Sequence, residues 1–212
     1  MSDRICYIVG AGESYGLTFT PAEGDYVIAA DGGFAHLLRQ NMRTDLLIGD
    51  FDSLSVKPEH TKTVLLEKEK DETDMYAAIS EGIQQGYDLF HIYGGTGGRF
   101  DHTIANLQLI ACLSQTNKRA FLHGDGFVVT SITDTSIIMG AHHRGIISIF
   151  SHSNESTGVC LEGLKYRLDD ATVTSTFPIG VSNEFTGTQS KVSVLHGTLI
   201  LILPKNDKEF VL

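Results

Sequence analysis

The chain has 212 residues, 42% of them hydrophobic, and a formal net charge of −10 at pH 7. This balance is typical of a folded globular protein and excludes a disordered tail. The chain contains 16 Lys and Arg residues but 26 Asp and Glu residues. Nucleic acid is therefore excluded as an expected partner, because binding a phosphate backbone requires a basic surface.

The cellular setting is indicated by the cysteines and by the hydropathy pattern. Cys6, Cys112 and Cys160 are odd in number and each lies in an apolar run, which predicts buried thiols in a reducing compartment. No run of about 18 apolar residues occurs, and the first residues lack the pattern of a signal peptide. We therefore expect a cytoplasmic protein without a membrane partner.

Short apolar runs alternate with helical patterns in the first half of the chain. The runs predict strands at residues 5–9, 26–30, 46–48, 63–66, 89–93 and 120–122. Apolar residues at helical spacing predict a helix over residues 71–86, with Gly86 as its stop. A second helix is expected over residues 101–114, apolar nearly all round and therefore well buried. This half should form an α/β domain with a mostly parallel sheet.

The pattern changes near residue 125, where helical periodicity disappears. Short alternating segments predict strands at residues 128–132, 137–140, 145–150, 171–177, 190–194 and 198–203. His196 and Gly197 predict a hairpin turn, and the polar residues 151–156 predict a loop. We expect an α/β domain over residues 1–125 and an all-β sandwich over residues 126–212.

Asp50 and Asp52 follow a buried strand that ends in Gly49. In an open α/β sheet, ligands bind at this end of the strands. Two carboxylates one residue apart can hold a hard cation, and Mg²⁺ takes one or two carboxylates together with substrate phosphates. A solvated Asp-Gly turn is the alternative.

A second acidic group opens the helix that runs to Gly86. Asp74 lies in its expected first turn after Thr73, and Lys70 comes just before. Such residues cap amides and complement the helix dipole, which is the simpler interpretation. Asp74 could also reach a metal, and Lys70 a phosphate.

Four glycines lie between a strand and a helix at residues 94–98, and Arg99 follows them. Glycines let backbone amides approach an anion closely, a helix N-terminus adds partial positive charge, and arginine binds phosphate with two parallel hydrogen bonds. The loop lacks the Gly-Lys-Ser/Thr of a Walker A motif. It predicts a phosphate site, with a tight turn as the alternative.

Weaker signals lie elsewhere. Gly10 and Gly12 follow the first strand, but Tyr15 replaces the third glycine of a dinucleotide motif, so a plain turn is expected. Asp31 and Gly32 end the second strand. They form either a turn and a helix cap, or Asp31 supplies a further carboxylate at the same edge of the sheet. For His142 and His143 a solvated turn is expected, because no other ligand stands at metal spacing.

Read together, these clusters closely resemble the thiamine pyrophosphokinase family in order and spacing. The matching residues are 31–33, 49–53, Lys70, 73–74 and 94–102 with Asn106. Residues 163–168 and 180–183 resemble segments of that family's β-domain, so the likeness covers most of the chain. It implies transfer of diphosphate from ATP to the hydroxyl of thiamine, giving thiamine diphosphate and AMP with Mg²⁺ as cofactor. It also implies a homodimer with active sites at the subunit interface.

The resemblance assigns roles residue by residue. The implied catalytic residues are Asp50, Asp52, Asp74, Arg99 and Asp101, of which Asp50, Asp52 and Asp74 would hold the metal. The implied ATP-binding residues are Asp31, Gly32, Lys70, Thr73, Gly95, Gly97, Gly98 and Arg99. The implied thiamine-binding residues are Asp101, Ser182 and Asn183, with Asp101 near the transferred group or the thiamine hydroxyl.

Two rival functions stay open on the sequence. One is another Mg²⁺-dependent phosphoryl or nucleotidyl transferase or hydrolase, which would use the same carboxylates with water or a different acceptor. The other is a non-catalytic protein that binds a small ligand, in which the acidic motifs only cap helices.

Overall fold

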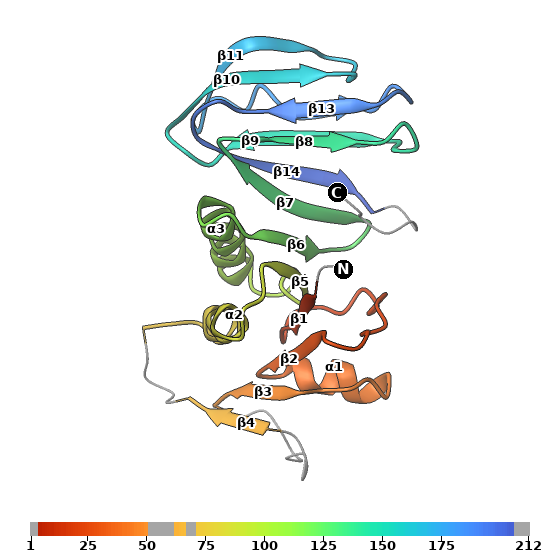
Figure 1. Ribbon diagram of the computed structural model, residues 1–212, viewed down its shortest axis with the longest axis vertical. Coiled ribbons are helices and arrows are strands. Elements are labelled where there is room, and N and C mark those ends of the chain that lie inside the picture. The colour runs from red at the N-terminus through yellow and green to blue at the C-terminus, as the bar shows by residue number, and fades with distance from the viewer. Residues whose placement is uncertain (1–3, 51–61, 67–70, 206–212) are drawn as a thin grey trace. The chain divides into compact units, whose positions relative to one another are not determined.

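The structure is a computed structural model, and it describes residues 4–50, 62–66 and 71–205 (Figure 1). Its contacts divide the chain into two compact units. The first comprises Met1–Leu109 and Lys118–Asp125, and the second comprises Ile110–Asn117 and Gly126–Leu212. No helix within the described ranges is long and apolar enough to cross a membrane.

The first unit is built on a parallel sheet whose described strands run in the order β6-β5-β1-β2-β3-β4. Their bounds are β1 Ile5–Val9, β2 Tyr26–Ala30, β3 Leu46–Gly49, β4 Lys62–Leu65, β5 Leu89–Tyr93 and β6 Arg119–His123. Strands β1, β2 and β3 are almost wholly buried, as near-continuous apolar runs in a parallel sheet require. The prediction of a mostly parallel α/β sheet is confirmed.

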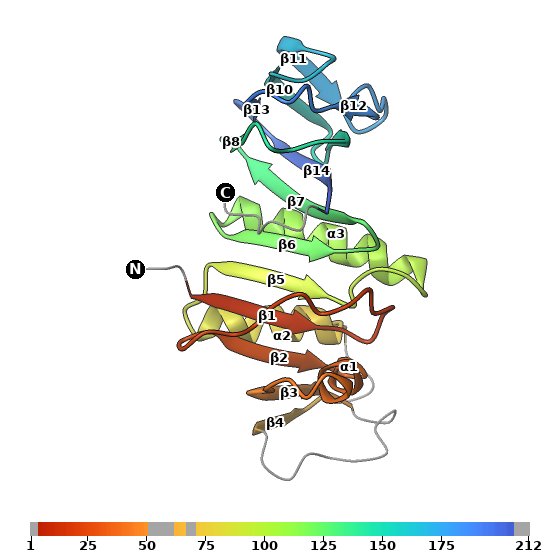
Figure 2. The same ribbon diagram turned by 90° about the vertical axis from the view of Figure 1, so that its right-hand side faces the viewer.

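Helices cover the two faces of this sheet (Figures 1 and 2). Helix α1 (Gly33–Arg39) lies on one face, and α2 (Asp74–Gln84) and the first part of α3 (Phe100–Gln115) lie on the other. Helix α2 approaches the sheet closely because a Cβ at Gly82 would lie 2.7 Å from the Phe90 ring. The predicted helix over residues 71–86 begins at Asp74.

Two expectations about burial are wrong. Helix α3 is not apolar and buried on all sides, because Ile104 is 45% exposed. Its buried positions fall on one face instead, and they include Ile110 and Leu113. Of the three thiols, Cys6 is buried, Cys160 is partly exposed and Cys112 is exposed. Cys112 lies on the exposed side of α3, where an apolar sequence neighbourhood does not imply burial.

The strand order reverses direction between β1 and β5. From β1 the chain steps through β2 and β3 to β4, whereas β5 and β6 lie on the other side of β1. The segment after β1 returns to β2 on the face that α1 covers, where its Leu17 packs in one cluster with Leu37 of α1, whereas the segment after β5 leads into α3 on the opposite face (Figure 2). Connections that part in this way leave a crevice at the carboxyl ends of the two strands, where open α/β sheets bind ligands.

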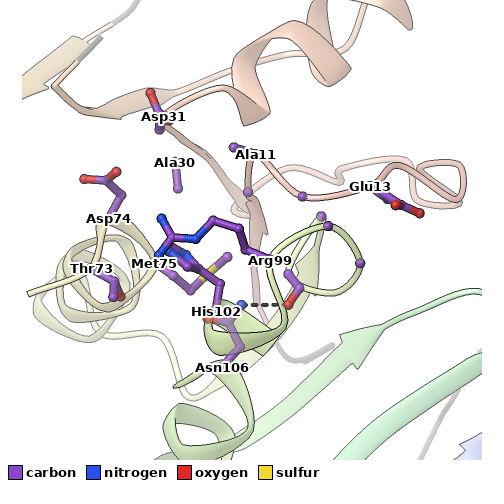
Figure 3. Close-up of a pocket in the computed structure, with 16 residues that line it drawn as sticks. Ala11, Glu13, Ala30, Asp31, Thr73, Asp74, Met75, Arg99, His102 and Asn106 are labelled. Carbon is purple, nitrogen blue, oxygen red and sulfur yellow. Dashed lines mark hydrogen bonds between the residues drawn. The ribbon is translucent and has the colours of Figure 1, made fainter. Parts of the chain in front are cut away.

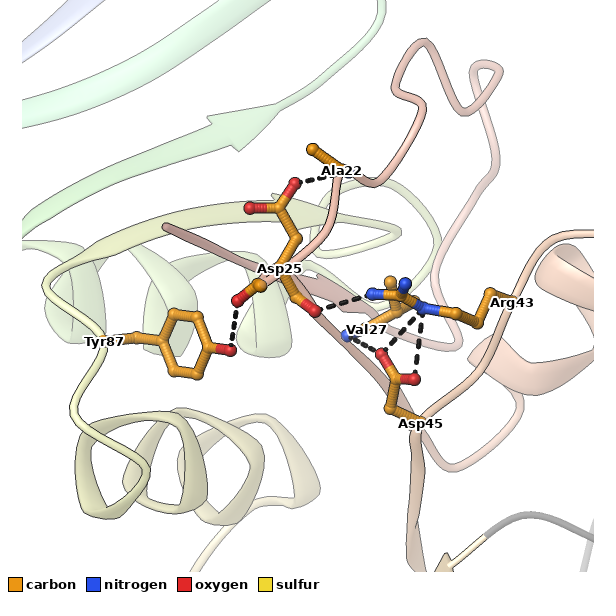
Figure 4. A network of polar contacts seen from close by, with 7 residues as sticks. Ala22, Asp25, Val27, Arg43, Asp45 and Tyr87 are labelled. Carbon is orange, nitrogen blue, oxygen red and sulfur yellow. Dashed lines mark hydrogen bonds and ion pairs between the residues drawn. The ribbon is translucent and has the colours of Figure 1, made fainter. Parts of the chain in front are cut away.

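At the opposite, amino edge of the sheet, aspartates bind the first amides of the strands (Figure 4). Asp25 accepts hydrogen bonds from the amides of Ile5 (2.9 Å) and Ala22 (2.8 Å). Asp45 accepts from the amide of Val27 (2.9 Å) and is paired with Arg43. These contacts satisfy donors that would otherwise be stranded at a buried sheet edge.

The second unit consists of two antiparallel sheets, so the predicted β-sandwich is confirmed. One sheet has the order β12-β9-β14-β7 and the other β11-β10-β13-β8. The bounds are β7 Phe127–Thr133, β8 Ser136–Met139, β9 Ile146–Ser151, β10 Glu155–Glu162, β11 Leu168–Thr174, β12 Asn183–Glu184, β13 Ser190–Ser193 and β14 Thr198–Pro204. A core of apolar residues from both sheets, among them Met139, Ile149, Leu161 and Leu201, lies between them.

Four local expectations in this unit need correction. The turn at His196 and Gly197 does not form a hairpin, because β13 and β14 lie in different sheets and the chain crosses between them there. Strand β10 occupies residues 155–162, part of which was expected to be a loop. The strand expected at residues 171–177 lies three residues earlier, at β11. His143 is buried and stacks on Phe185, with ring centroids 5.3 Å apart, so the expected solvation is wrong for His143, whereas His142 is exposed as expected. Burial lowers the pKa of His143.

Candidate active site

Two glycine-containing turns meet at the carboxyl ends of β1 and β5. The amide of Gly10 donates to the Tyr93 carbonyl (2.8 Å), and that of Gly12 donates to the Gly94 carbonyl (2.8 Å). One residue further, the amide of Glu13 donates to the Thr96 carbonyl (3.2 Å). These bonds extend the β1–β5 ladder beyond the sheet, so the two turns form one continuous surface.

Glycine is required where these turns touch. A Cβ at Gly12 would lie 2.6 Å from the Gly94 carbonyl oxygen, and a Cβ at Gly94 would collide with the Gly10 carbonyl. Gly94 also has a φ of 60°, and Gly97 has a φ of 79°. This left-handed region favours glycine, because a Cβ there meets the neighbouring backbone.

A pocket of about 490 Å³ opens over this surface (Figure 3). The structure brings together seven of the predicted site residues in its lining: Asp31, Thr73, Asp74, Gly95, Gly97, Gly98 and Arg99. Gly94, the first glycine of the predicted phosphate loop, also lines it. The remaining lining residues, which the sequence did not mark as ligand contacts, are Gly10, Ala11, Gly12, Glu13, Ala30, Met75, His102 and Asn106. The pocket therefore lies where the reversal of strand order predicts a ligand.

Asp31 is placed by an unusual backbone. It has a φ of 48°, a left-handed conformation that aspartate tolerates better than most residues. Its amide donates to the Ile48 carbonyl (2.8 Å), which ties it to β3. A Cβ at Gly49 would lie 3.1 Å from the Cα of Asp31, so this glycine allows the close approach. The residue after Gly49 is Asp50, so Asp31 and Asp50 leave adjacent strands at the same edge.

Thr73 and Asp74 begin helix α2. The hydroxyl of Thr73 accepts a hydrogen bond from the amide of Tyr76 (3.1 Å), which makes Thr73 the N-cap. Asp74 lies in the first turn, where its charge complements the helix dipole. Both residues also line the pocket, so their capping role does not exclude the predicted contact with a ligand.

Arg99 forms a two-pronged pair with Asp101. Its Nε lies 3.2 Å from Oδ1 of Asp101 and its Nη2 lies 2.5 Å from Oδ2. The hydrogen bond from Arg99 is the main cause that holds the pKa of Asp101 below its ordinary value, and the same bond raises the pKa of Arg99. Both side chains are exposed, at 73% and 62%. The guanidinium is thus oriented at the rim of the pocket by a carboxylate that stays ionised.

Asn106 fixes the glycine loop from helix α3. It is buried, and its Nδ2 donates to the Gly95 carbonyl (2.7 Å, dashed in Figure 3). Since Gly94 is already bound to Gly12, successive carbonyls of the loop are held by a side chain and by a backbone amide. The loop is therefore preorganised by its own chain.

Comparison with known proteins identifies the family. The sequence model described as "Thiamin pyrophosphokinase, catalytic domain" matches residues 21–122. The model described as "Thiamin pyrophosphokinase, vitamin B1 binding domain" matches residues 136–199. Together the two matches span well over half of the chain. The chain belongs to the thiamin pyrophosphokinase family.

Individual members of the family are similar along most of their length. The thiamine pyrophosphokinase of Bacillus subtilis (strain 168) is 27% identical over 182 residues, which cover 82% of this chain and 85% of that protein. A crystal structure of the Bacillus subtilis enzyme has a TM-score of 0.84 at 24% identity and covers 96% of this chain and 100% of its own. A family protein from Enterococcus faecalis has a TM-score of 0.82 at 27% identity, with the same coverage.

Not every predicted site residue of this thiamin pyrophosphokinase family member lies in the pocket. Gly32, Asp50 and Asp101 are outside its lining, although each is next to or near a lining residue in the chain. Gly32 instead packs against Ala11, since a Cβ there would lie 3.1 Å from the Ala11 Cβ. Asp52 and Lys70 lie outside the described residues.

Ser182 and Asn183 belong to the second unit. Asn183 is buried, and its Oδ1 accepts from the amides of Tyr166 and Glu184, each at 2.9 Å. Its Nδ2 donates to the Tyr166 carbonyl (2.6 Å). Ser182 is exposed, has a φ of 59°, and donates its amide to the Ser148 hydroxyl. Asn183 is thus engaged with its own unit, while Ser182 is presented at the surface.

The donor chemistry of the pocket edge fits a magnesium ion. Asp31 and Asp74 supply carboxylate oxygens there, the ligand type that Mg²⁺ prefers, and Asp50 follows the strand beside Asp31. In the part of the chain that the structure describes, no three His, Cys, Asp or Glu side chains gather closely enough to hold a metal. Because Asp52 is outside that part, the site formed by Asp50, Asp52 and Asp74 stays a prediction.

Proposed function

We propose that this protein transfers the diphosphoryl group of ATP to the hydroxyl of thiamine, giving thiamine diphosphate and AMP. One observation carries the proposal: a single chain matches the catalytic model and the vitamin B1-binding model of the family, in that order. The pocket at the β1–β5 crevice supports it, because glycine turns, an arginine and three carboxylates line it. Such a lining suits a polyphosphate on an otherwise acidic molecule.

The reaction needs alignment and charge neutralisation more than covalent chemistry. The hydroxyl oxygen of thiamine forms a bond to the β-phosphorus of ATP, and the bond from that phosphorus to the oxygen bridging to the α-phosphorus breaks, so AMP leaves. Negative charge spreads over the phosphoryl oxygens during transfer. Arg99 can neutralise part of it through two parallel hydrogen bonds, and the rigid glycine loop can hold the phosphates in line.

Asp101 suits an orienting role better than that of a strong base. Arg99 lowers its pKa, so near neutral pH it is a carboxylate that accepts a hydrogen bond readily but takes up a proton weakly. We propose that Asp101 accepts the hydrogen bond of the thiamine hydroxyl and points its oxygen at ATP. As the new bond to phosphorus forms, the hydroxyl proton passes through this hydrogen bond to solvent water, while AMP leaves with the electron pair of the broken bond.

A magnesium ion, held by Asp50, Asp52 and Asp74, is part of the proposal. When bound, it would supply positive charge to the polyphosphate and lower the barrier to attack. Asp31, Gly32, Lys70, Thr73, Gly95, Gly97 and Gly98 are proposed to contact or shape the ATP site. The acidic surroundings also suit thiamine, whose thiazolium ring carries a positive charge.

For thiamine we propose a division of roles between two neighbouring residues. Ser182 is exposed and would contact the substrate, whereas Asn183 holds the Ser182 loop through its bonds to Tyr166. By its likeness to the family, we further propose a cytoplasmic homodimer whose active sites lie at the subunit interface.

The deciding experiment incubates the purified protein with thiamine, ATP and Mg²⁺ and separates the products by chromatography. Thiamine diphosphate and AMP in equal amounts are expected, and EDTA should abolish both. Formation of thiamine monophosphate and ADP would indicate a different phosphoryl transferase. Phosphate release without thiamine would indicate a hydrolase. Calorimetry without any Mg²⁺-dependent ATP binding would favour a non-catalytic protein.

A further inference from the structure

Helix α1 packs directly on the turn that follows β1. A Cβ at Gly33 would collide with the Val9 carbonyl, and Gly32 lies against Ala11, so no side chain separates the helix from this turn. One turn further along the helix, His36 reaches the same segment: its Nε2 lies 3.0 Å from the Gly12 carbonyl oxygen. The contact joins residues that are 24 positions apart in the chain.

The neighbour of His36 determines which ring nitrogen carries the proton. Nη1 of Arg39 lies 3.1 Å from Nδ1 of His36, and a guanidinium can only donate hydrogen bonds. Nδ1 of His36 is therefore the acceptor, and the proton of the neutral ring lies on Nε2. His36 thus donates to the Gly12 carbonyl, and Arg39 holds the ring in this tautomer.

Gly12 is consequently fixed on both sides. Its amide donates to the Gly94 carbonyl in the glycine loop after β5, and its carbonyl accepts a hydrogen bond from His36. Gly10, Gly12 and Glu13 line the pocket, but His36 does not. We propose that His36 is a positioning residue for ATP, which acts by holding the β1 turn against the β5 loop. This inference rests on the proposed function, since it takes the pocket to be the ATP site.

Substitutions at His36 test the role. His36→Ala and His36→Phe both remove the donor, and the phenylalanine keeps a ring of similar volume in place. His36→Gln keeps an amide that can donate to Gly12. Leu38→Ala is the matched control, because Leu38 lies on the same short helix and is 61% exposed.

ATP affinity is measured by calorimetry with Mg²⁺ and without thiamine, beside the KM values for both substrates and the melting temperature. His36→Ala and His36→Phe should each weaken ATP binding about fivefold to tenfold, the effect of losing one such hydrogen bond. The KM for ATP should rise equally while the KM for thiamine stays unchanged. His36→Gln should bind ATP within about twofold of wild type, as should Leu38→Ala.

Wild-type ATP affinity in both His36→Ala and His36→Phe would overturn the inference. So would an equal rise of both KM values, or a loss in His36→Gln as large as in His36→Ala, because each would point to general loosening of the fold. A wild-type protein that binds ATP but forms no thiamine diphosphate would contradict the proposed function alone, since the calorimetric comparison does not depend on that reaction.

Discussion

The pairing of Arg99 with Asp101 couples two residues to which different roles are assigned. Each orients the other, and the guanidinium keeps the carboxylate ionised. An arginine that binds phosphate must share its donors between Asp101 and the ligand. A planar fork with five N–H groups can do so, whereas the compact ammonium of lysine cannot reproduce the geometry.

We therefore expect Arg99→Lys to lower kcat/KM for ATP by about 10²-fold, in the range found for lost transition-state donors. The pH profile should change as well. Arg99 lowers the pKa of Asp101, so weakening the pair lets this carboxylate protonate at a higher pH. The acid limb of the kcat/KM profile should move toward higher pH in the variant. Initial rates measured from pH 4 to 8 give this profile. If its acid limb does not move, protonation of Asp101 does not limit catalysis.

Asn106 offers a second test at the same scale. In Asn106→Asp an oxygen replaces the buried Nδ2 that donates to the Gly95 carbonyl, so two acceptors face each other. We expect the free energy of unfolding to fall by about 1–3 kcal/mol and ATP binding to weaken. The matched control is Gln108→Glu, an exposed amide-to-acid change on the same helix. Denaturant titration and calorimetry compare the two, and equal losses would show that added charge on α3 is the cause.

At the scale of elements, the β1 turn and the β5 loop behave as one unit. Gly12→Ala would place a methyl group 2.6 Å from the Gly94 carbonyl and 2.8 Å from that of Thr96. We expect the turns to separate and the KM for ATP to rise at least tenfold, because misplacement of positioning groups is costly. Gly16→Ala is the control: it has a φ of 88° but open space around it. Similar KM values in both variants would contradict the predicted link between the turns.

The strands of the first unit were predicted to within about one residue because parallel strands are buried on both faces and read as continuous apolar runs. The sandwich was harder to predict. Strand β10 begins in a polar stretch, yet Ser156 is fully buried with its hydroxyl bonded to Ser151 and to the Thr198 carbonyl. Hydropathy does not reveal a polar residue whose hydrogen bonds are made by distant strands.

The same limit applies to the site. Asp31, Asp74 and Arg99 could be proposed from strand ends, helix starts and family likeness. Gly10 and Gly12 could not, because their role depends on contact with Gly94, more than 80 residues away. A short glycine turn alone is compatible with many loops. His36 carries no sequence signal either, since only the fold brings it to the Gly12 carbonyl.

The amino edge of the sheet should affect stability without affecting the reaction. Asp45→Ala leaves the amide of Val27 without its side-chain acceptor and removes the partner of Arg43. We expect a loss of about 1–3 kcal/mol in the free energy of unfolding with unchanged KM for ATP. Asp45→Asn keeps an acceptor oxygen and should lose less, because an exposed ion pair contributes little. A raised KM in Asp45→Ala would show that this edge is coupled to the pocket.

On the scale of the whole molecule, a net charge of −10 opposes the binding of ATP, which is itself anionic. Long-range repulsion is screened by salt within about 10 Å at 0.1 M, so local positive charge decides the outcome. Arg99 supplies positive charge in the pocket lining, and the proposed magnesium ion would supply more. ATP affinity should therefore depend steeply on Mg²⁺ and only weakly on the total charge of the protein.

Two substitutions that remove the same single negative charge separate these effects. Asp50→Asn alters a proposed magnesium ligand, whereas Asp169→Asn alters an exposed carboxylate on β11 in the second unit. We expect Asp50→Asn to raise the Mg²⁺ concentration for half-maximal turnover at least tenfold and Asp169→Asn to leave it unchanged. Turnover against Mg²⁺ at fixed ATP measures both. If Asp50→Asn kept near-normal turnover at saturating Mg²⁺ with an unshifted midpoint, Asp50 would not be a metal ligand. If both variants shifted alike, the net charge and not the site would govern ATP binding.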